Sequence, residues 1–228
     1  MGFEGWAYLR GVNCNFQQSV MRAKGSKSTA GAIPRGVVSR AVKDVLSSRA
    51  EHKQITAVNA YADLATAGAV SSLLQAIGQG DDINARSGDQ ILVEKTKLRI
   101  VFKNTAGAGS GNTARVLLVS DTLNQGSVPA VTDILASADV LSGFTQTAAQ
   151  QHRYKVLLDH RVATVSNTNA QVVCVDRELR LNRKVFYTAA SGATSHGRNA
   201  IFILFITDAA SAGSIQVKWS HQTSYLDV

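Results

Sequence analysis

The spacing of apolar residues along the chain changes once, near residue 53. Before that point, apolar residues recur every three to four positions with basic residues between them, which predicts an amphipathic helix over about 37–49. Beyond it, short runs of alternating apolar and polar residues are separated by Gly, Ser and Asn, which predicts strands. The chain therefore divides into an arm, residues 1–53, that contains one short helix, and an all-β body, residues 54–228.

The body contains eight strand-like runs. Lys95 to Phe102 alternates between apolar and basic residues, as expected for a strand with one buried face. In contrast, Ala114–Val119 and Ala200–Ile206 are apolar on both faces, which predicts central strands covered from both sides. Two packed antiparallel sheets would bury all of these faces. The predicted strands lie near 54–62, 70–77, 90–103, 113–121, 152–165, 173–187, 200–208 and 214–225.

One connection in the body is too long for a hairpin turn. About 30 residues separate Asp121 from His152, and within them Pro129, followed by the apolar stretch 131–135, predicts a short helix. Such a loop fits one end of a sandwich, where the chain crosses between sheets. The predicted fold class is thus all-β: a single eight-stranded jelly-roll β-sandwich with a basic N-terminal arm containing a short helix.

Charge is distributed as unevenly as the hydrophobic pattern. The arm carries nine Lys and Arg residues against three acids, whereas the body carries 15 bases against 13 acids. A basic segment joined to a nearly neutral body is typical of a protein that holds a polyanion with its tail. We expect eight arm residues to bind nucleic acid: Arg22, Lys24, Lys27, Arg35, Arg40, Lys43, Arg49 and Lys53.

Composition excludes several classes of protein. Hydrophobic residues make up 45% of the chain and charged residues 18%, which is typical of a globular protein. The longest apolar run has seven residues, far below the roughly 20 that a membrane-spanning helix needs, so no membrane insertion is expected. Two cysteines are too few for a disulfide framework or a zinc site.

Candidate chemistry is sparse. The five histidines have no Glu or Cys at ligand spacing, and no organised group of titratable residues indicates an enzyme. Asp81, Asp82 and Asp89 offer the oxygen ligands that calcium prefers, but Arg86 lies between them and favours a solvated or salt-bridged loop. We therefore predict neither catalysis nor a cofactor, and structural calcium between subunits is an alternative that the sequence does not support.

Four short motifs, in order along the chain, resemble those of small viral coat proteins. They are the turn Arg86–Ile91, the strand Arg115–Asp121, the helical stretch Val131–Leu135 and the strand Arg153–Asp159. On these motifs the chain, over roughly residues 35–228, resembles the capsid proteins of circular Rep-encoding single-stranded DNA viruses. That family is similar in fold to the coat proteins of small satellite RNA viruses such as satellite tobacco necrosis virus.

The resemblance implies a single jelly roll that assembles with copies of itself into a small icosahedral shell in the virion. It implies a single-stranded genome as the partner of the arm, DNA rather than RNA, and does not indicate a host receptor. Met21 resembles a start of such proteins more than Met1 does, so we hypothesise that residues 1–20 are absent from the mature protein.

Two questions stay open at this level. A soluble β-sandwich binding module, lectin-like or nucleic-acid-binding, with a basic tail is the alternative to a shell subunit. The outward bases Lys95, Lys97 and Arg99 could face either nucleic acid or the acids of a neighbouring subunit.

Overall fold

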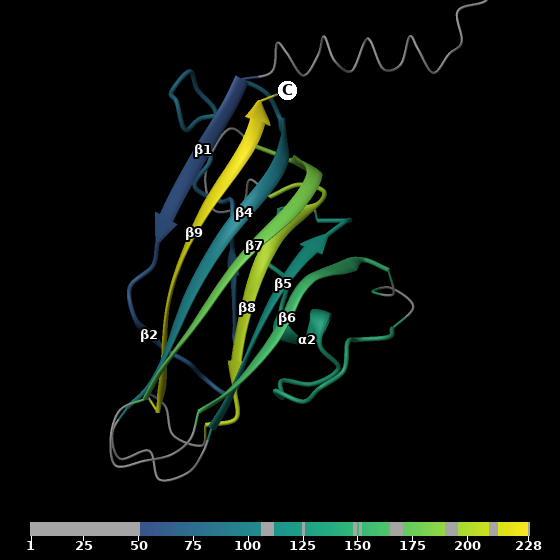
Figure 1. The fold of residues 1–228 in the computed structure, drawn as a ribbon. Coiled ribbons are helices and arrows are strands. Elements are labelled where there is room, and N and C mark those ends of the chain that lie inside the picture. Colours follow the sequence, from purple (N-terminus) through teal and green to yellow (C-terminus); the bar gives the residue numbers. More distant parts are fainter. Residues whose placement is uncertain are drawn as a thin grey trace, which may run out of the picture. The chain divides into compact units, whose positions relative to one another are not determined.

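The structure is a computed structural model that describes residues 51–227 except 106–111, 125, 148–149, 151, 165–170, 190–195 and 210–213 (Figure 1). The arm up to residue 50, and with it the helix predicted over about 37–49, lies outside the described residues. The first described residue, Glu51, begins a strand.

The described residues form two antiparallel sheets. Sheet I has the order β1-β9-β4-β7, with the two-residue β2 also paired to β9, and sheet II has the order β3-β8-β5-β6 (Figure 1). The elements are β1 (Glu51–Val58), β2 (Ala62–Asp63), β3 (Ala69–Ser72), β4 (Gln90–Asn104), β5 (Asn112–Asp121), α2 (Val131–Ile134), β6 (Tyr154–Thr164), β7 (Gln171–Phe186), β8 (Ala200–Thr207) and β9 (Ile215–Asp227).

The pairing is nested, which defines the jelly roll. The first strand pairs with the last, β1 with β9, and then β3 pairs with β8, β4 with β7 and β5 with β6. A long hairpin of eight strands rolled up in this way places alternate pairs in opposite sheets. The predicted fold class is confirmed, and β2 is a short addition that the sequence pattern did not indicate.

Most predicted strand bounds agree with the structure to within three residues, and two differences are informative. The strand predicted over 54–62 runs instead over Glu51–Val58, so three residues assigned to the arm belong to the body. The strand predicted over 70–77 ends at Ser72, and the apolar residues that follow it, Leu73, Leu74 and Ile77, are buried within turns. Apolar residues in a turn extended the predicted strand because hydrophobicity alone does not mark where pairing ends.

The main core lies between the sheets and is filled by alternate residues of the strands. A bulge between Val93 and Lys95 shifts the alternation of β4, so that Val93 and Thr96 both point inward and Lys95 points out. A second cluster lies on the other face of sheet II, where β5 and β8 contact the segment 122–153. These two strands are therefore buried on both faces, as predicted, whereas the outward residues of sheet I, with the exception of the buried Leu226, are exposed or half-buried.

Candidate nucleic-acid interface and subunit contacts

Of the eight arm residues predicted to bind nucleic acid, the structure describes Lys53 alone, and it corrects that assignment. Lys53 points inward from β1 and its residue surface is 4% exposed. Its Nζ donates hydrogen bonds to Ala85 O at 2.9 Å and to Asp227 Oδ2 at 3.1 Å, and lies 3.1 Å from Glu51 Oε2. Lys53 is thus a structural residue of the body. Arg22, Lys24, Lys27, Arg35, Arg40, Lys43 and Arg49 lie outside the described residues.

Electrostatics keep this buried pair ionised at neutral pH. Burial lowers the pKa of Lys53, but the hydrogen bonds and charges of Asp227 and Glu51 outweigh burial and raise it above the ordinary lysine value. Burial raises the pKa of Asp227, yet two hydrogen bonds from Ser87 and the contact with Lys53 bring it below the ordinary value. Ser87 donates through both its backbone N–H and its hydroxyl, each at 2.8 Å.

The three outward bases of β4 belong to a larger charged surface. Strand register places basic residues of β7 and β9 on the same outer face of sheet I as Lys95, Lys97 and Arg99. We name this surface the basic face, and its seven bases are Lys95, Lys97, Arg99, Lys103, Arg180, Lys184 and Lys218. It also carries four acids: Asp63, Glu94, Asp176 and Glu178. Sequence reasoning missed the bases of β7 and β9 because their facing depends on pairing between distant strands.

The charges of the basic face are balanced in some rows and not in others. Lys97 lies opposite Glu178, and their charged atoms are 3.6 Å apart. Arg99 lies opposite Asp176, whereas Lys95 lies opposite Arg180, another base.

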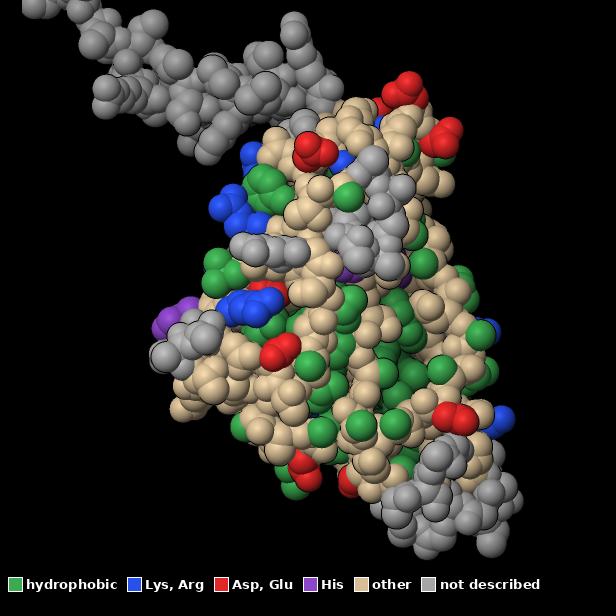
Figure 2. All heavy atoms as spheres, turned by 180° about the vertical axis from the view of Figure 1, so that it is seen from behind, with side chains coloured by type: hydrophobic (Ala, Val, Ile, Leu, Met, Phe, Trp, Pro, Cys, Tyr) green, Lys and Arg blue, Asp and Glu red, His purple; other side chains and the backbone are tan. Residues whose placement is uncertain are grey.

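Figure 2 shows the molecule from the side opposite to that seen in Figure 1. On that side few Lys and Arg side chains are visible, and hydrophobic side chains gather toward the middle.

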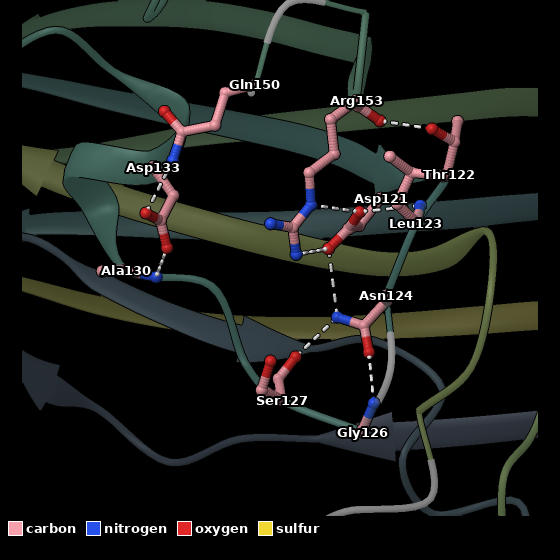
Figure 3. Close-up of polar contacts among 10 residues, drawn as sticks. All are labelled: Asp121, Thr122, Leu123, Asn124, Gly126, Ser127, Ala130, Asp133, Gln150 and Arg153. Carbon is pink, nitrogen blue, oxygen red and sulfur yellow. Dashed lines mark hydrogen bonds and ion pairs between the residues drawn. The ribbon is translucent and has the colours of Figure 1, made fainter. Parts of the chain in front are cut away.

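The segment 122–153 is fastened to the end of β5 by one buried carboxylate. Arg153 donates from Nε and Nη2 to the two oxygens of Asp121, at 2.8 and 2.7 Å (Figure 3). Asn124 Nδ2 and the N–H of Leu123 donate to the same carboxylate at 3.1 Å each. Asp121 is fully buried, so the two ends of the segment are held together by a bidentate, charge-assisted contact.

Further contacts in the same segment shape its helical turn and loop. Asp133 Oδ2 accepts from the N–H of Ala130 at 2.8 Å at the start of α2, and its other oxygen accepts from Gln150 Nε2 at 2.8 Å. Gly126 adopts a positive φ of 94°, a conformation that glycine tolerates best, and its N–H donates to Asn124 Oδ1 at 2.9 Å (Figure 3).

A second arginine, which is buried, holds the middle of the segment. Arg115 of β5 donates from Nε and Nη2 to the two oxygens of Asp159, each at 2.8 Å. Its Nη1 donates to the carbonyls of Val140, at 3.1 Å, and Ser142, at 2.6 Å. The hydrogen bonds from Arg115 lower the pKa of Asp159 below the ordinary value, against a smaller opposing effect of burial. The resemblance motifs beginning at Arg115 and Arg153 thus start with the residues that fasten this segment.

The fastened segment presents apolar side chains to solvent. Leu123 is 61% exposed and Leu141 77% exposed, and Val128 and Phe144 are also exposed. Apolar side chains held in fixed positions on a surface are typical of protein contacts. This segment is therefore the candidate surface for contacts between subunits.

Nothing in the described residues adds a catalytic or metal site. Among them, no group of three or more His, Cys, Asp and Glu side chains could hold a metal ion. In the turn considered for calcium, Arg86 is fully buried, contacts Asp89 Oδ1 at 3.4 Å and donates to the carbonyls of Gly88 and Ala189. No helix in the described part of the chain is long and apolar enough to cross a membrane.

A jelly roll preceded by a basic arm is the architecture of small viral coat proteins. Residues 21–228 match the family model of the satellite tobacco necrosis virus coat protein, and the chain belongs to this family. Its function is that of a viral coat protein, a structural component of the virion and not an enzyme.

Three relatives illustrate the match. The chain is 35% identical over 196 residues to the coat protein of Maize white line mosaic Satellite virus, covering 83% of this chain and 87% of the relative. It is 36% identical over 171 residues to the capsid protein of Satellite tobacco necrosis virus 1, covering 74% of this chain and 84% of the relative. It is 33% identical over 197 residues to the coat protein of Satellite tobacco necrosis virus 2, covering 85% of this chain and 95% of the relative.

Among solved structures, a chain of Desmodium yellow mottle tymovirus aligns with this protein at a TM-score of 0.35 and 12% sequence identity. The alignment covers 100% of this chain and 96% of the tymovirus chain.

The sequence comparisons narrow the family resemblance that was inferred from the sequence motifs. They support the satellite virus coat proteins and give no support to the capsid proteins of circular single-stranded DNA viruses.

Proposed function

We propose that this coat protein assembles into a small icosahedral shell and packages a single-stranded RNA through its basic arm. The observation that carries the proposal is the charge partition in a member of this family: nine bases against three acids in residues 1–53, ahead of a complete jelly roll. Lys53 is removed from the binding set because it is buried, which leaves Arg22, Lys24, Lys27, Arg35, Arg40, Lys43 and Arg49.

Electrostatics make the arm a weak binder alone and an effective one in a shell. Each phosphate contact with a single strand adds about 0.7 to the slope of log K against log salt concentration, so seven bases bind only modestly at physiological salt. A closed shell concentrates many arms around one polyanion, and avidity then strengthens a contact that reads no sequence. The arm carries a single tryptophan, Trp6, so base stacking adds little.

The proposal replaces DNA with RNA as the cargo. The sequence resemblance favoured DNA, but the relatives found are coat proteins of satellite viruses of the satellite tobacco necrosis virus type. Phosphate contacts do not distinguish the two nucleic acids, so the cargo is decided by nuclease digestion and not by arm charge.

Closed shells need head-to-tail contacts between different surfaces of neighbouring subunits. We assign one of these surfaces to the segment 122–153, because its exposed Leu123 and Leu141 are held in place by Asp121 and Arg115.

The test is expression of the full chain beside a variant with the seven arm bases changed to Gln. Wild type should form shells by electron microscopy, with an absorbance ratio typical of nucleoprotein and a cargo digested by ribonuclease after disassembly. The Gln variant should lose most of this cargo. A matched control that exchanges the four arginines among these seven bases for lysine should keep it, since charge and not guanidinium geometry is required.

A chain that stays monomeric at every salt concentration would support the soluble binding module and overturn the shell. Shells that retain a full cargo in the Gln variant would overturn the role of the arm. A cargo resistant to ribonuclease and sensitive to deoxyribonuclease would return the assignment to DNA. An intact mass that includes Met1 or Gly2 would contradict the hypothesis that residues 1–20 are absent from the mature protein.

A further inference from the structure

We infer that the basic face of sheet I is a second nucleic-acid contact, provided by the folded body, that binds phosphates without reading bases. The inference rests on the proposed packaging function, and it adds a site to the arm. The site is formed by seven bases that three strands bring to one surface.

The net positive charge of the body lies on this face. Seven bases and four acids lie on it, whereas the other eight bases of residues 54–228 are outnumbered by nine acids. Of those eight, Arg86, Arg115 and Arg153 are engaged with Asp89, Asp159 and Asp121. An excess of one sign on one sheet face raises the local concentration of a polyanion over that face.

Three of the seven bases, Lys95, Arg180 and Lys184, form a group whose neighbouring acid, Glu94, contacts His52 at 3.4 Å. Lys95 lies directly opposite Arg180, and one row further along, Lys184 lies opposite Leu92. No ion pair in the described part of the chain involves Lys95, Arg180 or Lys184. Like charges directly opposite one another destabilise a sheet, and a bound phosphate between them would reverse that effect.

The composition of the face favours nucleic acid over a neighbouring subunit. Between the bases lie Ser220, Gln222 and Ser224 of β9. The aromatic residue at an outward position of these strands, Phe186 at the end of β7, lies under the guanidinium of Arg198, at 4.6 Å from its ring centroid. The cores of protein interfaces are depleted in Lys and Ser and enriched in aromatic residues, which is the opposite composition. On the segment 122–153, Leu123 and Leu141 are 61% and 77% exposed, whereas on β7 the exposed apolar residue opposite Lys103 is Val172, at 54%.

The group also lies at the end of the sheet where the arm joins the body. The outward row that begins with His52 continues through Leu226 and Leu92 to Lys184, and the next row runs from Gln54 to Lys95 and Arg180. At a strand spacing of about 4.8 Å, His52 and Lys184 are roughly 14 Å apart across the sheet. The group therefore lies at the end of sheet I where the chain enters β1 at Glu51.

The expected binding is electrostatic. Along β4, Lys95, Lys97 and Arg99 repeat every second residue, about 6.7 Å apart, and offer a row of donors to successive phosphates. Arg198 covers the ring of Phe186, so the face offers little surface on which bases could stack, and poly-uridine and poly-adenosine should bind to it about equally.

The experiment compares three full-length proteins: wild type, the variant K95Q/R180Q/K184Q, and the control K155Q/R161Q/R177Q. The control removes three exposed bases outside the basic face: Lys155 and Arg161 of β6, and Arg177, whose register opposite Leu98 places it on the other face of sheet I. Binding of fluorescent 20-nucleotide poly-uridine and poly-adenosine to dissociated protein is measured by anisotropy from 50 to 300 mM salt, and shells are examined for assembly and cargo.

The basic-face variant should assemble as wild type does, package less nucleic acid, and show a salt slope lower by about 2, which is three contacts at about 0.7 each. The control should keep the wild-type slope and cargo. Equal slopes for the basic-face variant and the control would overturn the inference, as would a variant that binds nucleic acid normally but no longer assembles, since the face would then be a subunit contact. If the proposed role of the arm is wrong, the variant with seven arm bases changed to Gln will retain its cargo. That result does not depend on the salt slope of the basic-face variant, so the two failures can be distinguished.

Discussion

Lys53 in the first strand and Asp227 in the last strand form a buried ion pair, with 3.1 Å between Nζ and Oδ2. They are 174 positions apart in the sequence and become neighbours because β1 pairs with β9 at the edge of sheet I. Ser87 donates two further hydrogen bonds to the Asp227 carboxylate, so the pair joins β1, β9 and the turn that precedes β4.

Removing one partner of this pair leaves a buried charge. We expect Lys53→Met to lower the free energy of unfolding by about 3–5 kcal/mol, and the double variant K53M/D227N to lose less than the single variant. Calorimetric thermal unfolding at one fixed protein concentration measures both. Shells of K53M that still form should keep the wild-type cargo per subunit; a loss of cargo without a loss of stability would restore Lys53 to the nucleic-acid set.

Asp121 should stabilise the whole segment 122–153, because its carboxylate holds the two ends of that segment together. In Asp121→Asn an amide group replaces a carboxylate oxygen that accepts from Arg153 and Asn124, which leaves the Arg153 charge without its partner (Figure 3). We expect a loss of about 3–5 kcal/mol and faster proteolysis within 122–153 than elsewhere. Limited proteolysis with mass spectrometry checks the second point, and cleavage spread evenly along the chain would contradict it.

The exposed leucines of the same segment should act on assembly and not on folding. Leu123→Ser and Leu141→Ser remove side chains that are 61% and 77% exposed, so the unfolding temperature of the dissociated subunit should change by no more than about 1–2 °C. The subunit concentration needed for shells should rise about tenfold, as sedimentation velocity would show. Val172→Ser, at a residue 54% exposed on sheet I, is the matched control and should assemble normally.

His221 should make the subunit sensitive to acid. Burial lowers its pKa to about 4, whereas the unfolded chain has the ordinary value near 6.5. As the pH falls below 6.5 the unfolded state takes up the proton first, so stability is complete above about 6.5 and declines toward pH 4, by roughly 3 kcal/mol in total.

The variant His221→Gln should flatten this part of the stability profile, whatever its effect on stability at neutral pH. Urea unfolding of the dissociated subunit at half-unit steps from pH 4 to 7 measures the slope. His52→Gln, at an exposed histidine, serves as the control and should follow the wild-type slope. Identical slopes for wild type and H221Q would show that another group carries the acid sensitivity.

Much of the fold could be predicted because alternation is a local property. In the run from Lys95 to Phe102, the alternation of apolar and polar residues indicates which side chains point inward. The predicted strand over 90–103 matches Gln90–Asn104. Errors arose where the local pattern was misleading, at a lysine in an inward position of β1 and at the buried turn residues Leu73 and Leu74.

The candidate surfaces were predicted less completely. The outward position of Lys95 follows from β4 alone, but its opposition to Arg180 follows from a pairing across about 85 residues. Arg115 and Arg153 were noted as parts of motifs, and only the packed structure shows that each holds a carboxylate and the segment between them.

The sequence by itself determined the all-β class, the places of the strands and the division of charge between arm and body, because hydrophobic periodicity and net charge are properties of short stretches of chain. The tertiary structure decided that Lys53 is buried, that three strands share one basic face and that the segment 122–153 is rigidly held. Those features depend on register between strands far apart in the chain, which sets the partner of each charge, and a charge is buried only where its partner is present.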